Sequence, residues 1–139
     1  MVIGFDYDGT LYNVPHFENF IKLISPTLNE HMLFLLTSRD MVDFDMKNHI
    51  SSLGLKIRDK DMFAIGKHIS NGMFDSKAHY MKSMNMPCNM FFDNDPYEIE
   101  DLRKFGIPCL WVPELNKNSL MWEITENFFF ERGKKSESY

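Results

Sequence analysis

Short apolar segments recur along this chain and alternate with segments whose apolar residues have helical spacing. Five of them are candidate strands, at residues 2–5, 32–37, 61–66, 88–93 and 107–112. Because strands that alternate with helices form parallel sheets covered on both faces, this order predicts a doubly wound sheet. We therefore expect a three-layer α/β/α fold with a five-stranded parallel sheet.

The segments between these runs predict the helices. The first begins at Pro15, a residue favoured in the first turn, and the second stops at Gly54, a common residue after a helix. The polar stretch at residues 67–72 is interpreted as a loop, and residues 133–139 are expected to fray. The expected helices span residues 15–24, 41–53, 76–85, 96–105 and 118–131.

Length and composition indicate one ordinary globular domain. The chain has 139 residues, of which 44% are hydrophobic and 25% charged, and it shows no repeat or linker. We therefore expect a single domain over residues 1–139. Its apolar runs are too short to cross a bilayer, and Asp6 comes too early for a signal peptide, so a cytoplasmic location is expected.

Charge and cysteine content exclude some classes of function. The net charge is −5, and residues 93–101 contain five acids and no base, so strong nonspecific binding of nucleic acid is not expected. Cys88 and Cys109 lack the spacing of a zinc site and are interpreted as buried free thiols. The five histidines share no ligand spacing either. Trp111, Trp122 and the run Phe128–Phe130 are interpreted as packing residues.

The stretch FDYDGT places two carboxylates at the end of the first strand. Side chains alternate in extended chain, so Asp6 and Asp8 can point to the same side. Two like charges held this close repel each other, by roughly 1 kcal/mol at 4 Å in water and by more in a drier cleft. Either a divalent cation or a proton would offset the repulsion, and both indicate a reactive site. The alternative is a turn with two solvated aspartates.

Three more residues fall at the same edge of the predicted sheet. Thr37 ends the second strand, Asp93 ends the fourth, and Lys77 opens the helix that leads into the fourth strand. In parallel α/β sheets the functional crevice lies at the carboxyl ends of the strands. These residues can therefore converge with Asp6 and Asp8.

Taken together, the four elements resemble the haloacid dehalogenase (HAD) superfamily of phosphotransferases. The resemblance extends from residue 2 to about residue 112, and each motif appears in the expected order. The motifs are FDYDGTL, MLFLLTS, SKAHYMKSM with its lysine, and NMFFDND. The resemblance implies a HAD-like, Rossmann-like fold.

The resemblance also implies a mechanism. Asp6 would attack phosphorus to form an aspartyl-phosphate, and Asp8 would act first as general acid and then as base. Mg²⁺ would be held by Asp6, the backbone carbonyl of Asp8, and Asp93, since this hard cation takes oxygen ligands. Together with Mg²⁺, Lys77 and Arg39 would balance the charge of the phosphate and the carboxylates.

Other assignments implied by the family remain open between neighbouring residues. Thr37 would donate its hydroxyl to the phosphate, but a register shift of one residue would exchange it with Ser38. Lys77 competes with Lys67, and it is preferred because it starts a helical pattern just before the fourth strand. Arg39 follows the second motif by two residues, as in capless nucleic-acid end-processing members, but a surface arginine at a helix start is equally consistent.

The fourth motif departs from the family pattern. Many members have two adjacent acids there, whereas this chain has Asp93 followed by Asn94. Asn94 is grouped with Ser38 and Arg39 as a candidate substrate-binding residue. Asp95 or Glu98 could replace the missing acid through water, or could simply favour the first turn of a helix.

The spacing of the motifs leaves no room for the cap domain that many members insert after the first or third strand. We therefore expect an Mg²⁺-dependent phosphomonoesterase with an open site, and phosphates at nucleotide or nucleic-acid ends are candidate substrates. The alternatives are a noncatalytic phosphate-binding module, a phosphatase of phosphoproteins or small phosphomonoesters, and transfer of phosphate to an acceptor other than water.

Overall fold

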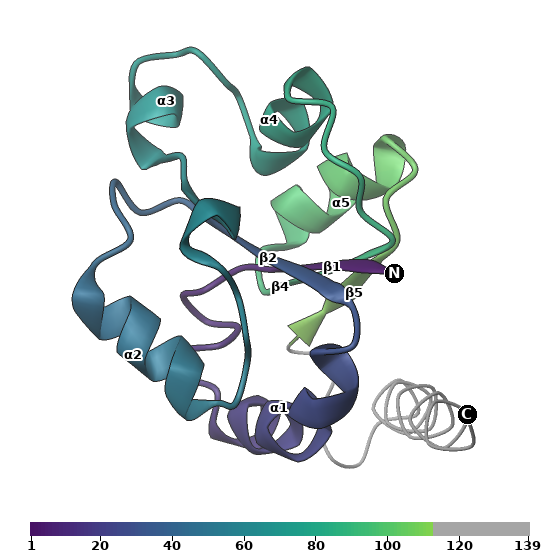
Figure 1. Ribbon diagram of the computed structural model, residues 1–139. Helices are drawn as coiled ribbons and strands as arrows, with labels where there is room; N and C mark the ends of the chain where they lie inside the picture. Colours follow the sequence, from purple (N-terminus) through teal and green to yellow (C-terminus); the bar gives the residue numbers. More distant parts are fainter. Residues whose placement is uncertain (113–139) are drawn as a thin grey trace.

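The computed structural model describes residues 1–112 of the chain (Figure 1). The strands are β1 (Val2–Phe5), β2 (Met32–Thr37), β3 (Met62–Ala64), β4 (Met90–Asp93) and β5 (Cys109–Trp111). The helices are α1 (Pro15–Leu28), α2 (Phe44–Ser52), α3 (Gly66–Ser70), α4 (Lys77–Ser83) and α5 (Pro96–Lys104), with a short 3₁₀ turn, η1 (Asp59–Asp61), before β3.

The strands form one sheet in the order β3-β2-β1-β4-β5, and every pairing is parallel. This confirms the predicted doubly wound α/β fold. The chain builds outward from β1 through β2 to β3 and then returns to the other side of β1 with β4. Strand order therefore reverses between β1 and β4, the position where parallel sheets form ligand-binding crevices.

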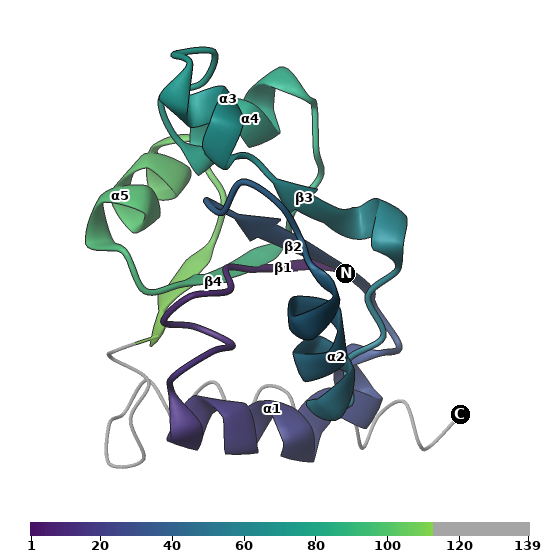
Figure 2. The same cartoon turned by 90° about the vertical axis from the view of Figure 1, so that its left-hand side faces the viewer.

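Helices cover the sheet on both faces. α1 and α2 lie on one side, and α3, α4 and α5 lie on the other (Figures 1 and 2). Alternate residues of each strand serve the two faces: Ile3 and Phe5 pack toward α1 and α2, whereas Phe34 and Phe91 pack toward α4 and α5. Because both faces are covered, the strands are apolar except at the carboxyl ends of β2 and β4, and this explains the continuous apolar runs in the sequence.

α1 is one turn longer than predicted because it continues past Pro26. Proline has no N–H to donate to the carbonyl of Lys22, four residues earlier. The hydroxyl of Ser25 donates to that carbonyl instead, at 3.1 Å. The polar group that proline leaves without its helical partner is therefore satisfied, and the helix runs on to Leu28.

Other boundaries differ by a few residues, and one helix was not predicted. The expected loop at residues 67–72 begins with α3, a five-residue helix too short and polar to show an apolar period. Cys109 is a buried free thiol as predicted, but Cys88 is only partly buried, which corrects that expectation. Burial raises the pKa of Cys88 to about 11 and that of Cys109 to about 12.

Two further observations concern the segments between the strands. Within residues 1–112, α1 is the helix between β1 and β2, and α3 and α4 lie between β3 and β4, so no inserted cap domain occurs there.

No helix in that part of the chain combines the length and apolar character needed to cross a membrane. The predicted helix at 118–131, Trp122, Phe128–Phe130 and the tail lie outside the described residues.

Gly4 lies where the central strand passes between two aromatic side chains, and this generates a prediction. A Cβ at Gly4 would lie 2.4 Å from Phe34 Cζ and 2.5 Å from Phe91 Cδ2. Gly4→Ala should therefore lower the free energy of unfolding by about 1–3 kcal/mol, the usual cost of overpacking, measured by urea denaturation. Phe34→Leu removes one of the opposing atoms, so the cost of Gly4→Ala should be smaller in that background. Equal costs in both backgrounds would contradict the packing argument.

Candidate active site

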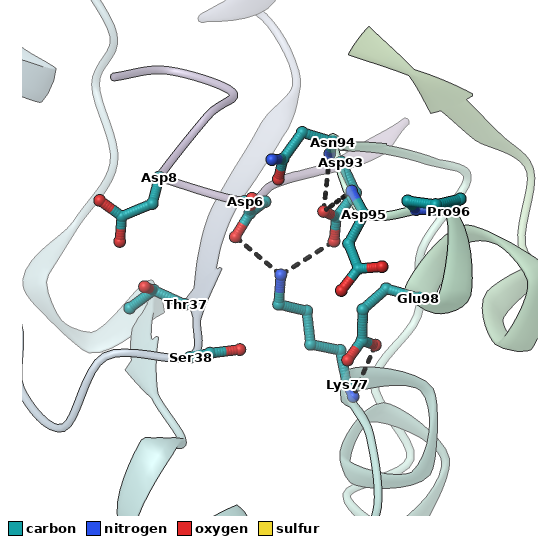
Figure 3. A pocket seen from close by; sticks show the side chains of 10 residues that line it. All are labelled: Asp6, Asp8, Thr37, Ser38, Lys77, Asp93, Asn94, Asp95, Pro96 and Glu98. Atoms are coloured by element: carbon teal, nitrogen blue, oxygen red, sulfur yellow. Dashed lines mark hydrogen bonds and ion pairs between the residues drawn. The ribbon is translucent and has the colours of Figure 1, made fainter. Parts of the chain in front are cut away.

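A cavity of about 390 Å³ opens at the carboxyl ends of the strands, at the reversal between β1 and β4 (Figure 3). Strand ends and helix starts that are remote in sequence contribute its walls. The cavity is lined by Asp6, Asp8, Thr37, Ser38, Lys77, Asp93, Asn94, Asp95, Pro96 and Glu98. All the residues that the sequence predicted for the site line this cavity except Arg39.

Lys77 bridges the two carboxylates that end β1 and β4. Its ammonium nitrogen lies 2.7 Å from Asp6 Oδ1 and 2.8 Å from Asp93 Oδ2 (Figure 3). The side chain is almost fully buried. Although burial opposes its charge, the two carboxylates raise the pKa of Lys77, so it is a cation at neutral pH.

The position of Lys77 follows from local structure around the start of α4. Ser76 caps this helix by accepting a hydrogen bond from the backbone N–H of His79. The backbone N–H of Lys77 itself donates to Glu98 Oε2 at 3.0 Å, which ties the start of α4 to the first turn of α5. Burial raises the pKa of Glu98, against the attraction of Lys77.

Asp6 is buried and fully hydrogen-bonded. Its second carboxylate oxygen, Oδ2, accepts from the hydroxyl of Thr10 at 3.2 Å, and Thr10 is itself fully buried. Burial raises the pKa of Asp6 to about 7, with the charge of Lys77 opposing the shift and that of Asp93 adding to it. Two carboxylates share one ammonium, so the trio of Asp6, Asp93 and Lys77 carries one excess negative charge when all three are ionised.

Asp93 has no exposed surface and is held by the turn that follows β4. Its Oδ1 accepts the backbone N–H groups of Asn94 at 2.7 Å and of Asp95 at 3.0 Å, while Oδ2 faces Lys77. Asp95 in turn caps α5 by accepting from the N–H of Tyr97 at 2.9 Å. The motif FDNDP therefore both fixes the Asp93 carboxylate and begins a helix.

The side chain of Asn94 lies between β1 and β4. We orient its carboxamide with the nitrogen inward, because the oxygen would otherwise face acceptors alone. The nitrogen then donates to Asp6 Oδ2 at 2.9 Å, to the backbone carbonyl of Asp8 at 3.1 Å and to Asp93 Oδ1 at 3.3 Å. Asn94 therefore lines the cavity and contacts the predicted metal ligands.

Asp8 points away from the Lys77 ammonium (Figure 3) and forms an ion pair with Arg39. The pair is bidentate: Arg39 Nε lies 2.8 Å from Asp8 Oδ2, and Arg39 Nη2 lies 2.7 Å from Oδ1. The guanidinium also lies over the ring of Tyr7, 5.0 Å from its centroid, and 6.0 Å from that of Tyr12. Arg39 is thus held by Asp8 and two tyrosines beside the cavity.

The two tyrosines beside Arg39 are themselves held by contacts with α1 and α2. The rings of Tyr7 and Tyr12 stack with centroids 5.5 Å apart. The Tyr7 hydroxyl and His49 Nδ1 are hydrogen-bonded at 2.9 Å, and His49 Nε2 lies 2.7 Å from Glu18 Oε1. Burial raises the pKa of Tyr7 to about 12. The aromatic stack under Arg39 is therefore anchored to α1 and α2.

The remaining predicted residues fall at the end of β2 or outside the cavity. Thr37 is buried, and its hydroxyl accepts from the backbone N–H of Arg39 at 3.2 Å. Ser38, the alternative to Thr37, also lines the cavity. Lys67 is exposed on α3 and is not one of the lining residues, whereas Lys77 is central to the site.

Sequence reasoning missed three contacts of the site. Thr10 belongs to the DGT turn and was read as a turn residue, although a hydroxyl two residues after Asp8 could have been suspected of bonding a nearby carboxylate. The link from Glu98 to the Lys77 backbone and the pairing of Arg39 with Asp8 join segments that are remote in sequence. No local pattern could have indicated either contact.

Potential cation ligands are limited to a small set of oxygens. In residues 1–112 no group of three or more His, Cys, Asp or Glu side chains is arranged to hold a metal ion. The oxygens that do converge are two carboxylates, from Asp6 and Asp93, and the backbone carbonyl of Asp8. This donor set is of the hard type that suits Mg²⁺, and such sites ordinarily keep several waters.

Comparisons with known proteins identify no family. No family model matches the chain, and the search of curated proteins found no match. Two solved structures are distantly similar: a single-mutant thermostable NPPase from Geobacillus stearothermophilus, at 16% identity, and a hypothetical protein from Pyrococcus horikoshii, at 17%. In both cases the TM-score is 0.34, and the match covers 78% of this chain and 40% of the other. Similarity at this level shows neither the family nor the activity of this chain.

The raised pKa of Asp6 generates a prediction about stability. Because the pKa is about 7 in the folded protein and about 3.8 in the unfolded chain, the folded state holds an extra proton between these values. The contribution of Asp6 to stability therefore falls as pH rises from about 4 to about 7. Asp6→Asn removes this cost, so at pH 8 without divalent cations it should be more stable than the native protein, by on the order of 1 kcal/mol.

Thermal unfolding at pH 5 and pH 8 measures this effect. The gain should shrink at pH 5, where Asp6 is protonated in the folded native protein. Asp59→Asn is the matched control, because Asp59 is highly exposed and its substitution should change little at either pH. A gain of the same size at both pH values would contradict the assignment.

Proposed function

We propose that this protein is an Mg²⁺-dependent phosphomonoester hydrolase that acts through an aspartyl-phosphate on Asp6. The observation that carries the proposal is the bridge from Lys77 to Asp6 and Asp93 at the floor of an open polar cavity. The excess negative charge of this buried trio favours binding of a cation, and the Lys77 ammonium favours binding of an anion such as phosphate. The trio lies where the strand order reverses, the usual place for a ligand in such sheets. The four motifs of the HAD superfamily, which meet in this cavity, support the same function.

The donor set fits the magnesium ion that the resemblance implies. Three oxygens are available, from Asp6, Asp93 and the backbone carbonyl of Asp8. They lie close enough together for one cation to contact all of them, because each already faces the same side-chain nitrogen of Asn94. When bound, the ion would neutralise these carboxylates and the phosphate oxygens, which lowers the barrier to attack by an anion. Lys77 contributes one further positive charge from the opposite side of Asp6.

Asp6 is proposed as the nucleophile because it is held on both oxygens and lies at the cavity floor. In the first step a carboxylate oxygen of Asp6 bonds to phosphorus, while the bond from phosphorus to the leaving oxygen breaks. Asp8 gives its proton to that oxygen, so the product leaves as an alcohol. In the second step water attacks the phosphorus, Asp8 takes a proton from the water, and phosphate leaves Asp6.

This role requires Asp8 to leave Arg39. The carboxylate that should deliver a proton is held in a bidentate ion pair with Arg39, away from Lys77. A phosphate dianion entering the cavity competes for the same guanidinium, since phosphate and carboxylate both accept bidentate bonds from arginine. Arg39 could then exchange Asp8 for the substrate, and the freed Asp8 carboxylate would take up a proton from solvent before it turns toward the leaving group as the acid.

The end of β2 supplies further donors for phosphate. The hydroxyl of Thr37 accepts from Arg39 N–H and can donate its own hydrogen at the same time. The neighbouring Ser38 lines the cavity with a second hydroxyl. With no inserted cap domain in residues 1–112, the cavity can admit a phosphate carried on a larger molecule, so a terminal phosphate of a nucleotide or nucleic acid is the substrate class that we favour.

Phosphate release from an aryl phosphate tests the proposed function. Activity should depend on added Mg²⁺, disappear with chelator, and fall by at least a thousandfold in Asp6→Asn and strongly in Asp8→Asn. The stability of Asp6→Asn, measured as above, shows that any loss is chemical and not a failure to fold. Binding of phosphate ligands without turnover would instead indicate a noncatalytic module, and turnover unaffected by Asp6→Asn would contradict the proposed nucleophile.

The proposed exchange at Arg39 makes a separate prediction. Arg39→Ala removes a cation beside the cavity, so KM for a phosphomonoester should rise about tenfold or more. Arg58→Ala is a matched control, because Arg58 pairs with Asp61 by η1, outside the cavity. Steady-state kinetics of both variants provide the measurement. An unchanged KM in Arg39→Ala would assign Arg39 to holding Asp8 and not to binding phosphate.

A further inference from the structure

The place between β1 and β4 where three oxygens converge is filled by a side chain of the protein itself. The amide nitrogen of Asn94 lies 2.9 Å from Asp6 Oδ2, 3.1 Å from the carbonyl oxygen of Asp8 and 3.3 Å from Asp93 Oδ1. A primary amide has two hydrogens, so at least one of them is shared between two acceptors. A small group with positive partial charge thus stands at the focus of two carboxylates and a carbonyl.

The backbone around the amide is shaped to accept it. Gly9 has a φ of +73°, and in the orientation adopted for Asn94 a Cβ built on Gly9 would lie 2.3 Å from the carboxamide oxygen of Asn94 and 2.8 Å from its Cγ. The absence of a side chain at Gly9 therefore provides the space that the carboxamide occupies. Asn94 is also fixed from its own backbone, whose N–H donates to Asp93 at 2.7 Å. The close fit is a built feature of the turn and not a loose surface contact.

The three acceptors of Asn94 are also the three oxygens that could hold a divalent cation under the proposed function. A cation and the amide nitrogen cannot occupy the same focus. Both offset the repulsion between Asp6 and Asp93, and Lys77 supplies the rest of the compensation from the other side. The site is therefore satisfied without a cation, because every carboxylate oxygen already has a donor.

We propose that the side chain of Asn94 competes with the divalent cation and so sets the affinity of the site for it. This inference rests on the cation site of the proposed function. Cation binding requires the carboxamide to withdraw from Asp6, Asp8 and Asp93, so the lost hydrogen bonds are subtracted from the binding free energy. The site then stays closed by Asn94 at low cation concentration and loads as the concentration rises.

Mn²⁺ binding, followed by electron paramagnetic resonance of the free ion and repeated with Mg²⁺ by calorimetry, tests the competition. Asn94→Ala leaves all three oxygens in place and removes the competitor, so it should bind Mn²⁺ about tenfold more tightly than the native protein, the scale of one or two lost hydrogen bonds. Asn71→Ala is the matched control, because Asn71 is exposed and its side chain accepts from the Met73 N–H outside the cavity. Its Mn²⁺ affinity should equal that of the native protein.

A second readout follows the side chain directly. In the native protein the side-chain NH₂ resonances of Asn94, identified by their loss in Asn94→Ala, should shift when Mg²⁺ is added, while those of Asn71 should not. Asn94→Ser provides a second small variant if the alanine variant does not fold, and it should also bind the cation more tightly. Unchanged or weaker binding in the folded variant would overturn the competition and would make Asn94 a bystander or a ligand.

The outcomes separate this inference from the proposed function. If the native protein binds Mn²⁺ and hydrolyses a phosphomonoester, but Asn94→Ala binds Mn²⁺ no more tightly, the inference alone is overturned. Tighter binding in Asn94→Ala without phosphate release in any variant supports the inference and overturns the proposed catalysis. Failure of both native and variant protein to bind the cation at millimolar concentration overturns the inference together with the magnesium dependence.

Discussion

The contact on which the rest of the site depends is the bridge from the Lys77 ammonium to the carboxylates of Asp6 and Asp93. These carboxylates end adjacent strands, and without a cation between them their repulsion would oppose the register in which β1 and β4 pair. Lys77 reaches them from the first residue of α4, so one side chain connects the sheet to a helix layer. The Lys77 bridge therefore connects the cavity, the paired ends of β1 and β4, and the start of α4.

The fold was predictable because its signals are local. Apolar runs such as MLFLLT mark buried parallel strands, and the strand ends identify which residues can meet at one edge. The positions of Asp6, Thr37, Lys77 and Asp93 in one cavity follow from that rule together with the order of the elements. One local failure came from a compensating contact: α1 continues past Pro26, where the hydroxyl of Ser25 donates to the carbonyl of Lys22.

What the sequence could not supply is which partner each charged group takes. The repulsion between the opening aspartates suggested a cation or a proton, and in the structure Asp6 shares the Lys77 ammonium with Asp93, whereas Asp8 pairs with Arg39. Asn94 was grouped with substrate-binding residues, yet its amide faces three oxygens of the protein. Such choices depend on orientation within a few ångströms and on the competition among several acceptors. Residue type and spacing carry no information about that competition.

The hydrogen bond from the Lys77 backbone to Glu98 gives the site a mechanical dependence on the helix layer. The backbone of Lys77 is hydrogen-bonded to Glu98 in the first turn of α5. A shift of α5 along α4 would therefore also move the Lys77 ammonium relative to the strands. Met81 of α4 and Ile99 of α5 belong to one buried apolar cluster, so the packing of this cluster helps to set the position of Lys77. Substitutions within this apolar cluster could therefore change the distance between the Lys77 ammonium and the two carboxylates without altering any polar group that lines the cavity.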